Sequence, residues 1–376
     1  MQPSRTDAVC GILPGHRIGA LVESGHVRAA PEIAPDQIQP ASLDLRLGGR
    51  AWRVRASFLP GRDVLVRQRL DALALHQIDL DSGAVLETGC VYLVELLEHL
   101  ALPPAIAAAA NPKSSTGRLD VFTRVIADGM RAFDQIAAGY DGPLYLEVSP
   151  RTFPILVRTG SRLSQLRFRV GSAVLGEDEL ARLQATQRLV DTPEPDLGAG
   201  GIAVSIDLAP RDGIVGYRAK RHTGLVDVDR RAACDVLDYW EPIGRVGKAG
   251  LVLDPDEFYI LASKEAVQVP PAFAAEMVPF DPLVGEFRVH YAGFFDPGFG
   301  WEAAGGAGAR AVLEVRSREV PFILEDGQIV GRLIYERLTE PPQTLYGAGL
   351  GSNYQAQGLK LSKHFKADGT STPAAG

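Results

Sequence analysis

The chain has 376 residues, 46% of them hydrophobic and 23% charged, which is enough apolar material for a packed core and excludes a mainly disordered protein. No apolar run approaches the ~20 residues of a membrane-spanning helix, and the first residues lack the charged-then-apolar layout of a secretion signal. The net charge of -7 opposes binding to the phosphates of a nucleic acid polymer. Three cysteines cannot build a disulfide framework. We therefore expect a cytoplasmic protein with neither nucleic acid nor membrane among its partners.

The predicted elements are mainly strands. Residues 16–25 (HRIGALVESG) predict a helix that ends at Gly25, and residues 176–190 (GEDELARLQATQRLV) predict another. Between and after them, alternating apolar runs predict short strands; the runs are YLVEL, LYLEV, LSQLRFRV, FYILA, AVLEV and GRLIYERL. Residues 191–201 (DTPEPDLGAGG) predict a linker, because they are rich in proline, glycine and acid.

The two halves of the chain repeat each other. Matching segments are separated by the same 167 positions (259 − 92 and 314 − 147); they are 92–104 with 259–271, 144–148 with 311–315, and 153–168 with 320–335. One constant offset over this span indicates a duplicated domain. The predicted division is a first domain over 1–190, a linker over 191–201, a second domain over 202–340, and a C-terminal lid with a disordered tail over 341–376.

Five segments carry a family resemblance; they are QIQPASLDLRLGGRAWRV (37–54), KSSTGRLD (113–120), YDGPLYLEV (140–148), VHYAGFFDPGFG (289–300) and NYQAQGLKLSK (353–363). In this order they resemble the motifs of the deoxycytidine triphosphate (dCTP) deaminases of the trimeric dUTPase superfamily, and the resemblance spans nearly the whole chain. It implies two tandem dUTPase-like domains, each a distorted jelly roll (β-clip) with few short helices. It also implies assembly with active sites between subunits, so a homo-oligomer is expected.

The motifs are divided unequally between the halves. The first half keeps the phosphate loop, residues 113–118, whereas the second half has FDPLVG (280–285) there, with no cation. The second half keeps the hairpin with His290 and Asp296-Pro297-Gly298, where the first half has Ile136-Ala137-Ala138-Gly139. Because the resemblance implies that the loop of one domain works with the hairpin of another, we predict a composite site built from the first loop and the second hairpin.

The resemblance implies deamination of dCTP by attack of water at C4, protonation at N3 and loss of ammonia. A zinc deaminase would carry an HxE…PCxxC layout, which is missing here. We therefore expect no metal ligands and no zinc. The resemblance implies a glutamate alone as the proton shuttle. Glu147 and Glu314 both end an apolar strand, where burial would raise the carboxyl pKa towards neutrality. Glu314 shares its half with the hairpin and is the expected catalyst. The alternative is a complete site in the first half that uses Glu147.

The loop is implied to bind the triphosphate. Ser114 and Ser115 offer hydroxyl and backbone donors, and Arg118 offers a forked guanidinium. Lys113 stands where the family usually has arginine and adds charge with less geometric control. Mg²⁺ is expected to enter bound to the triphosphate, without a protein cage. An exposed polar turn is the alternative interpretation.

The hairpin and the tail are implied to hold the rest of the nucleotide. Asp296 would accept a hydrogen bond from the sugar 3′-hydroxyl, and His290 is either part of the site or an ordinary strand histidine. Tyr354, Gln357 and Lys363 belong to a tail that would close over the nucleotide, with Gln357 on the base or a phosphate and Lys363 on the triphosphate. A merely flexible C-terminus is the alternative.

Three functions follow. The first is hydrolysis of dCTP to dUTP and ammonia, which supplies thymidylate synthesis. The second is a bifunctional enzyme that also cleaves dUTP to dUMP and pyrophosphate. The third is a non-catalytic regulator that binds deoxynucleotides. Asp44 and Asp207 recur in the two halves (SLDL and SIDL) and are expected to be structural.

Overall fold

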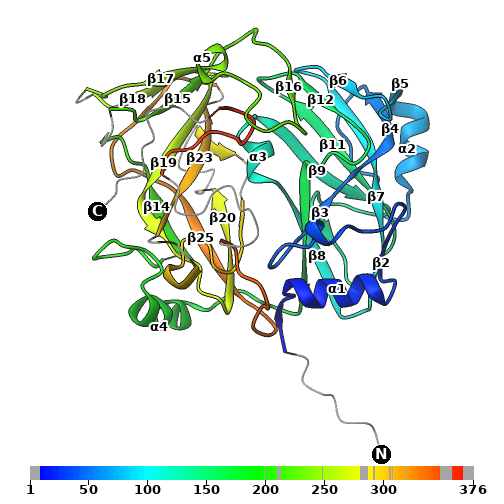
Figure 1. Ribbon diagram of the computed structural model, residues 1–376, viewed down its shortest axis with the longest axis horizontal. Coiled ribbons are helices and arrows are strands. Elements are labelled where there is room, and N and C mark those ends of the chain that lie inside the picture. Colours follow the sequence, from blue (N-terminus) through cyan, green and yellow to red (C-terminus); the bar gives the residue numbers. More distant parts are fainter. Residues whose placement is uncertain are drawn as a thin grey trace, which may run out of the picture.

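The computed structural model describes residues 9–198, 200–209, 213–247, 249–279, 287–290, 293–304, 306, 308–317, 319–347 and 358–366, with only the backbone at 279 and 287–290. Two β-rich halves lie side by side with few helices, as Figure 1 shows. The predicted mainly β, two-domain fold is confirmed. Among the described residues no helix is both long and apolar enough to cross a membrane.

The first half contains two sheets and a small ribbon. One sheet has the order β1 (Gly11–Ile12), β13 (Ser164–Val170), β8 (Ile106–Pro112) and β10 (Gln135–Ile136), with β3 (Leu43–Leu45) beside β13. The other has the order β5 (Ala74–Asp79), β4 (Leu47–Val54), β7 (Val91–Ala101), β11 (Asp141–Pro150) and β9 (Val121–Ala127), with β2 (Val27–Ala29) beside β7. The ribbon pairs β6 (Ala84–Leu86) with β12 (Ile155–Val157).

The second half repeats this arrangement. Its sheets have the orders β14 (Ile202–Ser205), β25 (Ile329–Arg337), β20 (Phe273–Pro279), β22 (Phe294–Phe295), and β17 (Trp240–Ile243), β15 (Gly216–Ala219), β19 (Phe258–Val267), β23 (Ala309–Ser317), β21 (Phe287–His290). Its ribbon pairs β18 (Leu251–Leu253) with β24 (Phe322–Leu324). The strand register repeats too: Glu147 pairs with Leu93 and Glu314 with Ile260, so the partners are also 167 apart (260 − 93).

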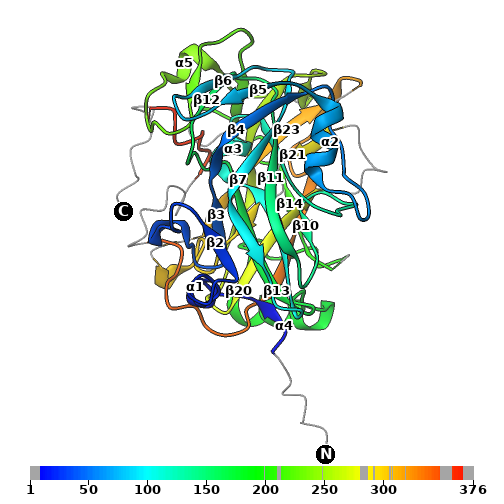
Figure 2. The same cartoon turned by 90° about the vertical axis from the view of Figure 1, so that its right-hand side faces the viewer.

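The helices are short and lie outside the sheets. They are α1 (Gly15–Glu23), α2 (Val66–Leu73), α3 (Ser114–Gly117), α4 (Glu177–Gln187) and α5 (Val236–Tyr239), with 3-10 turns η1 (Pro35–Gln37) and η2 (Glu302–Ala304). The two predicted helices are α1 and α4, which lie at one end of the molecule, away from α5 (Figures 1 and 2). Leu180 and Leu183 of α4 are buried in the core of the second half. The packing therefore places this helix with the second half, whereas the predicted division put it in the first domain.

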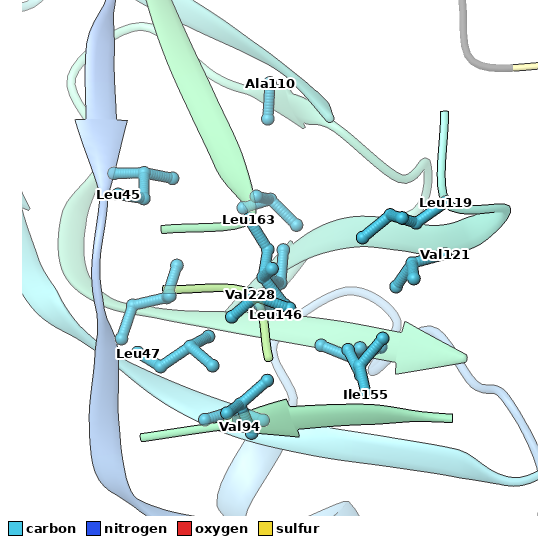
Figure 3. Close-up of a cluster of buried hydrophobic side chains, with 14 of the residues drawn as sticks. Leu45, Leu47, Val94, Ala110, Leu119, Val121, Leu146, Ile155, Leu163 and Val228 are labelled. Atoms are coloured by element: carbon cyan, nitrogen blue, oxygen red, sulfur yellow. The ribbon is translucent and has the colours of Figure 1, made fainter. Parts of the chain in front are cut away.

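The core of the first half continues into the second half. Val228 lies among Leu146 and Leu163 of the first half, as Figure 3 shows. Phe153 packs edge-on against Trp240, with 5.3 Å between ring centroids. A short strand of the second half, β16 (Val226–Asp227), pairs in parallel with β12. A shared apolar core joins domains more firmly than a polar interface does, so it holds the loop of one half against the sheet of the other.

Candidate active site

The phosphate loop of the first half faces the second half. It follows strand β8 and turns through α3, where the Lys113 carbonyl accepts the N–H groups of Thr116 and Gly117. Figure 1 shows α3 between the two halves. The turn directs the buried Arg118 at strand β23, with its Nε 3.9 Å from Oε1 of Glu314. The loop of one copy and the carboxylate of the other therefore meet within one chain.

Glu314 is a buried carboxyl group in the middle of a sheet. Strand β23 lies between β19 and β21, and only 6% of Glu314 is exposed. Burial raises the pKa of Glu314 to about 8, against the opposing effect of the positive charge on Arg118. A carboxyl group with a pKa near neutrality can both accept and return a proton at physiological pH.

A second ion pair joins the same two segments. Arg316, two residues beyond Glu314 on β23, donates through Nη2 to Asp120, two residues beyond Arg118. The Thr152 hydroxyl donates to the same Asp120 oxygen at 2.6 Å. Because Arg316 and Asp120 are both buried, this pair holds β23 against the loop at a fixed distance.

Glu147 has a different environment from Glu314. Arg124 donates to its Oε1 through Nε at 2.9 Å and Nη2 at 2.5 Å. The Arg124 guanidinium lies against the ring of Phe133, 3.7 Å from its centroid. In the strand register Arg124 stands opposite Glu147, as His290 stands opposite Glu314. The first-half carboxylate is thus held in an ion pair on its own sheet.

The C-terminal segment 358–366, red in Figure 1, lies against the loop. Arg118 Nη1 donates to the Lys360 carbonyl at 2.9 Å, and the Ser362 hydroxyl donates to the Ser115 carbonyl at 2.7 Å. His364 anchors this segment, since its Nε2 lies 2.9 Å from the Val228 carbonyl. The segment therefore contacts the loop of the first half and a strand end of the second.

Several cations lie close together around the loop. Burial and the charge of Lys113 lower the pKa of Lys363, and burial and the charge of Arg118 lower the pKa of Lys360. Lys113 itself forms an ion pair with the buried Asp44. Like charges at this range repel one another, and an anion placed among them relieves the repulsion.

The hairpin carboxylate, Asp296, lies within range of the charge on Lys113 of the phosphate loop. Asp296 follows β22 and is buried, and Arg167 of the first half lies 3.4 Å away, from Nη2 to Oδ1. Burial raises the pKa of Asp296, while the charges of Arg167 and Lys113 lower it. Lys113 is thus within electrostatic range of Asp296, so that the hairpin and the loop share one region.

The predicted site residues fall into three groups. The structure brings the loop residues (Lys113, Ser114, Ser115, Arg118) together with Glu314, Asp296 and Lys363, and leaves Glu147 in a separate ion pair. Only the backbone of His290 is described, and Tyr354 and Gln357 lie outside the described residues.

Three features were missed in the sequence: Arg124, Arg167 and the Ser362–His364 anchor. The available signal was a charged or polar residue within an otherwise apolar run, as in LSQLRFRV. Asp207, expected to be structural, pairs with Arg310 at 3.0 Å within the second half.

Comparison with known proteins agrees with this geometry. Residues 9–172 match the family model of the 2′-deoxycytidine 5′-triphosphate deaminase N-terminal domain, and residues 176–365 match that of its C-terminal domain. The chain belongs to the dCTP deaminase family. The resemblance found in the motifs is thereby confirmed, and the chain is an enzyme of this class, a dCTP deaminase.

Solved and curated relatives support the assignment. The crystal structure of 2′-deoxycytidine 5′-triphosphate deaminase from Agrobacterium tumefaciens is 62% identical with a TM-score of 0.84, and the match covers 88% of this chain and 99% of that one. A protein of Thermobifida fusca named dCTP deaminase, dUMP-forming, is 33% identical over 41% of this chain and 76% of its own length. A protein of Methanoculleus marisnigri with the same name is 31% identical over 42% and 79%.

Proposed function

We propose that Glu314 transfers the proton in the deamination of dCTP by this enzyme. The observation that carries the proposal is the buried Glu314 carboxyl, with its pKa raised to about 8, beside Arg118 of the phosphate loop. Its carboxylate takes a proton from the water that attacks C4, and the water oxygen forms the new C4–O bond. That proton passes to N3 of the ring. The proton of the new C4 hydroxyl then passes to N4, the C4–N4 bond breaks as the C4 carbonyl forms, and ammonia leaves with uracil as the product base.

The loop and the C-terminal segment bind the triphosphate. Arg118, Lys360 and Lys363 supply positive charge, and Ser114 and Ser115 supply hydroxyl and backbone donors. The charges of Arg118 and Lys113 help to lower the pKa of Lys360 and of Lys363, which supports an anion at this place. The substrate is the Mg²⁺ complex of dCTP, so the metal arrives with the phosphates and needs no carboxylate cage.

The hairpin binds the sugar. Asp296 accepts a hydrogen bond from the 3′-hydroxyl, which places the base towards Glu314. Its location near Lys113 supports this orientation, because the phosphates then lie on the loop side.

The final product we propose is dUMP. A second water attacks the α-phosphorus, the bond from that phosphorus to the bridging oxygen breaks, and pyrophosphate leaves. The support is that the relatives from Methanoculleus marisnigri and Thermobifida fusca are named dUMP-forming dCTP deaminases. The bifunctional alternative is therefore favoured over dUTP as the end product, which was the first expectation from the sequence.

The test uses purified protein with Mg²⁺ and dCTP, and measures ammonia while chromatography separates the nucleotides. Equal amounts of ammonia, dUMP and pyrophosphate are expected. Accumulation of dUTP with ammonia would overturn the second step alone. Saturable binding of dCTP without release of ammonia would show that the protein is a non-catalytic regulator. Glu314→Gln serves as the inactive control.

We also infer a homo-oligomer, from an asymmetry between the copies. Phe153 is fully buried because Trp240 and Phe365 of the second half cover it. Its counterpart 167 positions on, Val320, is 48% exposed. The second half covers the surface around Phe153 of the first half. The corresponding surface of the second half, around Val320, is exposed. An equivalent surface of another chain is the natural cover, since it is already complementary in shape and polarity.

A further inference from the structure

Arg167 belongs to the first half, but its guanidinium donates hydrogen bonds to the second half. It lies on β13. The residues on either side of it in the sequence, Leu166 and Phe168, are buried in the core of the first half. Nη1 donates to the Ala275 carbonyl and to Glu336 Oε2, both at 3.1 Å. Nη2 donates to the Phe295 carbonyl at 3.3 Å and contacts Asp296 Oδ1 at 3.4 Å. These four acceptors all lie in the second half.

The guanidinium is fixed before any ligand arrives. Only 2% of Arg167 is exposed, and the ring of Phe294 lies against it, 4.0 Å from the ring centroid to Cζ. Backbone carbonyls at Ala275 and Phe295 belong to paired strands and cannot follow a side-chain movement. Asp296 therefore meets a cation whose position is set by two sheets, and not by Asp296 itself.

A cation is needed at this place because several acids are buried together. Asp296 and Glu336 both contact Arg167. Burial raises the pKa of the nearby Glu276, and the charge of Arg167 opposes that rise. Removing the guanidinium would raise the pKa of Asp296 further, and a protonated carboxyl would donate where an acceptor is required.

We propose that Arg167 is a positioning residue that holds Asp296 as an ionised acceptor for the 3′-hydroxyl of the nucleotide, and so makes the enzyme select substrates that carry this hydroxyl. Among the described residues, Arg167 is the one group that hydrogen-bonds the Asp296 carboxylate, and it does so at Oδ1. Oδ2 is left for the sugar. The inference rests on the proposed function, because it assigns Asp296 to the sugar.

The test compares two substrates, dCTP and 2′,3′-dideoxy-CTP, which lacks the 3′-hydroxyl. The wild-type enzyme is expected to prefer dCTP in kcat/KM by about 10- to 100-fold, as for a charge-assisted hydrogen bond. Arg167→Met should lower kcat/KM for dCTP by a similar factor, mainly through KM, and leave the dideoxy substrate nearly unchanged. The preference then collapses. Asp296→Asn should collapse it equally, with no further loss in the double variant.

A pH profile separates positioning from mere structure. In Arg167→Met the preference for dCTP should return in part as the pH rises, because the Asp296 carboxyl then loses its proton and regains its charge. Taking the ratio of the two substrates cancels the titration of Glu314. A ratio that stays collapsed at every pH would contradict the ionisation argument.

Controls cover the remaining outcomes. Arg169→Met changes the next arginine on the strand, which contacts Gln135 at 3.4 Å in the first half, and should leave the preference intact. If Arg167→Met does not fold, Arg167→Lys keeps the charge but loses the fork, and a reduced preference is expected. Equal losses on both substrates, or a wild type without preference, would overturn the inference. Absence of ammonia from wild-type enzyme would instead overturn the proposed function.

Discussion

Arg118 and Glu314 lie 3.9 Å apart, from Nε to Oε1, although they come from different copies of a duplicated domain. The counterparts of these two groups in the other copies differ from them. The second loop, FDPLVG, has no cation, and the first carboxylate, Glu147, is paired with Arg124. We therefore propose that the two copies divide one site between them.

Glu314→Gln is expected to lower kcat by about 10²- to 10⁴-fold, the usual contribution of a general acid–base group. Glu147→Gln, the matched control in the other copy, should keep most of the activity. It should cost about 1 kcal/mol of stability, because a charge-assisted contact with Arg124 becomes neutral. Ammonia release and thermal unfolding measure the two effects. Loss of turnover in Glu147→Gln, with activity kept in Glu314→Gln, would move the catalyst to the first half.

The rate should depend on pH through Glu314. The carboxylate form accepts the proton from water, and the pKa of this group is raised to about 8. Below that pKa, kcat/KM should therefore rise by up to about tenfold per pH unit and level off above it. Steady-state rates between pH 7 and 9.5 test this, with Glu147→Gln as a variant that should keep the midpoint. A value of kcat/KM that falls over this range would show that the protonated form acts.

The same group should make the fold less stable in alkali. The pKa of Glu314 in the folded state, about 8, lies above the ordinary glutamate value of 4.5, so the folded state holds this proton more tightly than the unfolded state. The stabilisation is complete below pH 4.5 and is lost as the pH rises through 8. Glu314→Gln removes this dependence and should unfold at a higher temperature than wild type at pH 9, by roughly a few degrees. Identical melting curves of the two proteins at pH 9 would argue against burial of the Glu314 carboxyl and against a raised pKa of this group.

Protonation of His364 should lower the stability of the folded protein in acid. Burial lowers the pKa of His364 to about 4 from the ordinary histidine value of 6.5, so it is neutral at pH 7 and the unfolded state binds the proton more readily. Stability is therefore full above pH 6.5 and falls as the pH drops towards 4. Hydrogen exchange of residues 359–366 should accelerate between pH 7 and 5 after correction for intrinsic rates. His364→Gln, which keeps a donor for the Val228 carbonyl, should abolish this change; an unchanged pH response in the variant would locate the effect elsewhere.

The oligomer should depend on Val320. Val320→Asp places a charge on the surface whose counterpart is covered at Phe153, and should reduce the mass measured by light scattering. Val252→Asp is the control, because its counterpart Val85 remains 40% exposed in the covered half. A wild-type monomer, or an oligomer equally sensitive to both changes, would contradict the predicted contact.

The amino-acid sequence alone determined the duplication, the mainly β fold and the division of motifs between the halves. These depend on local patterns: alternating apolar residues, turn residues, and segments repeated at 167 positions. Strands with such patterns pair in the same register in each copy, as Glu147 and Glu314 show. A composite site could be proposed from the sequence because the altered motif of each half is visible in it.

Only the tertiary structure decided which charges neutralise which. Arg124 and Glu147 are neighbours across two strands, and Arg167 meets Asp296 from 129 positions away. The Ser362 hydroxyl reaches the Ser115 carbonyl from 247 positions away. The physical reason is that the pKa and orientation of a buried charged group depend on every element packed around it, and that packing is not encoded in the spacing of residues along the chain.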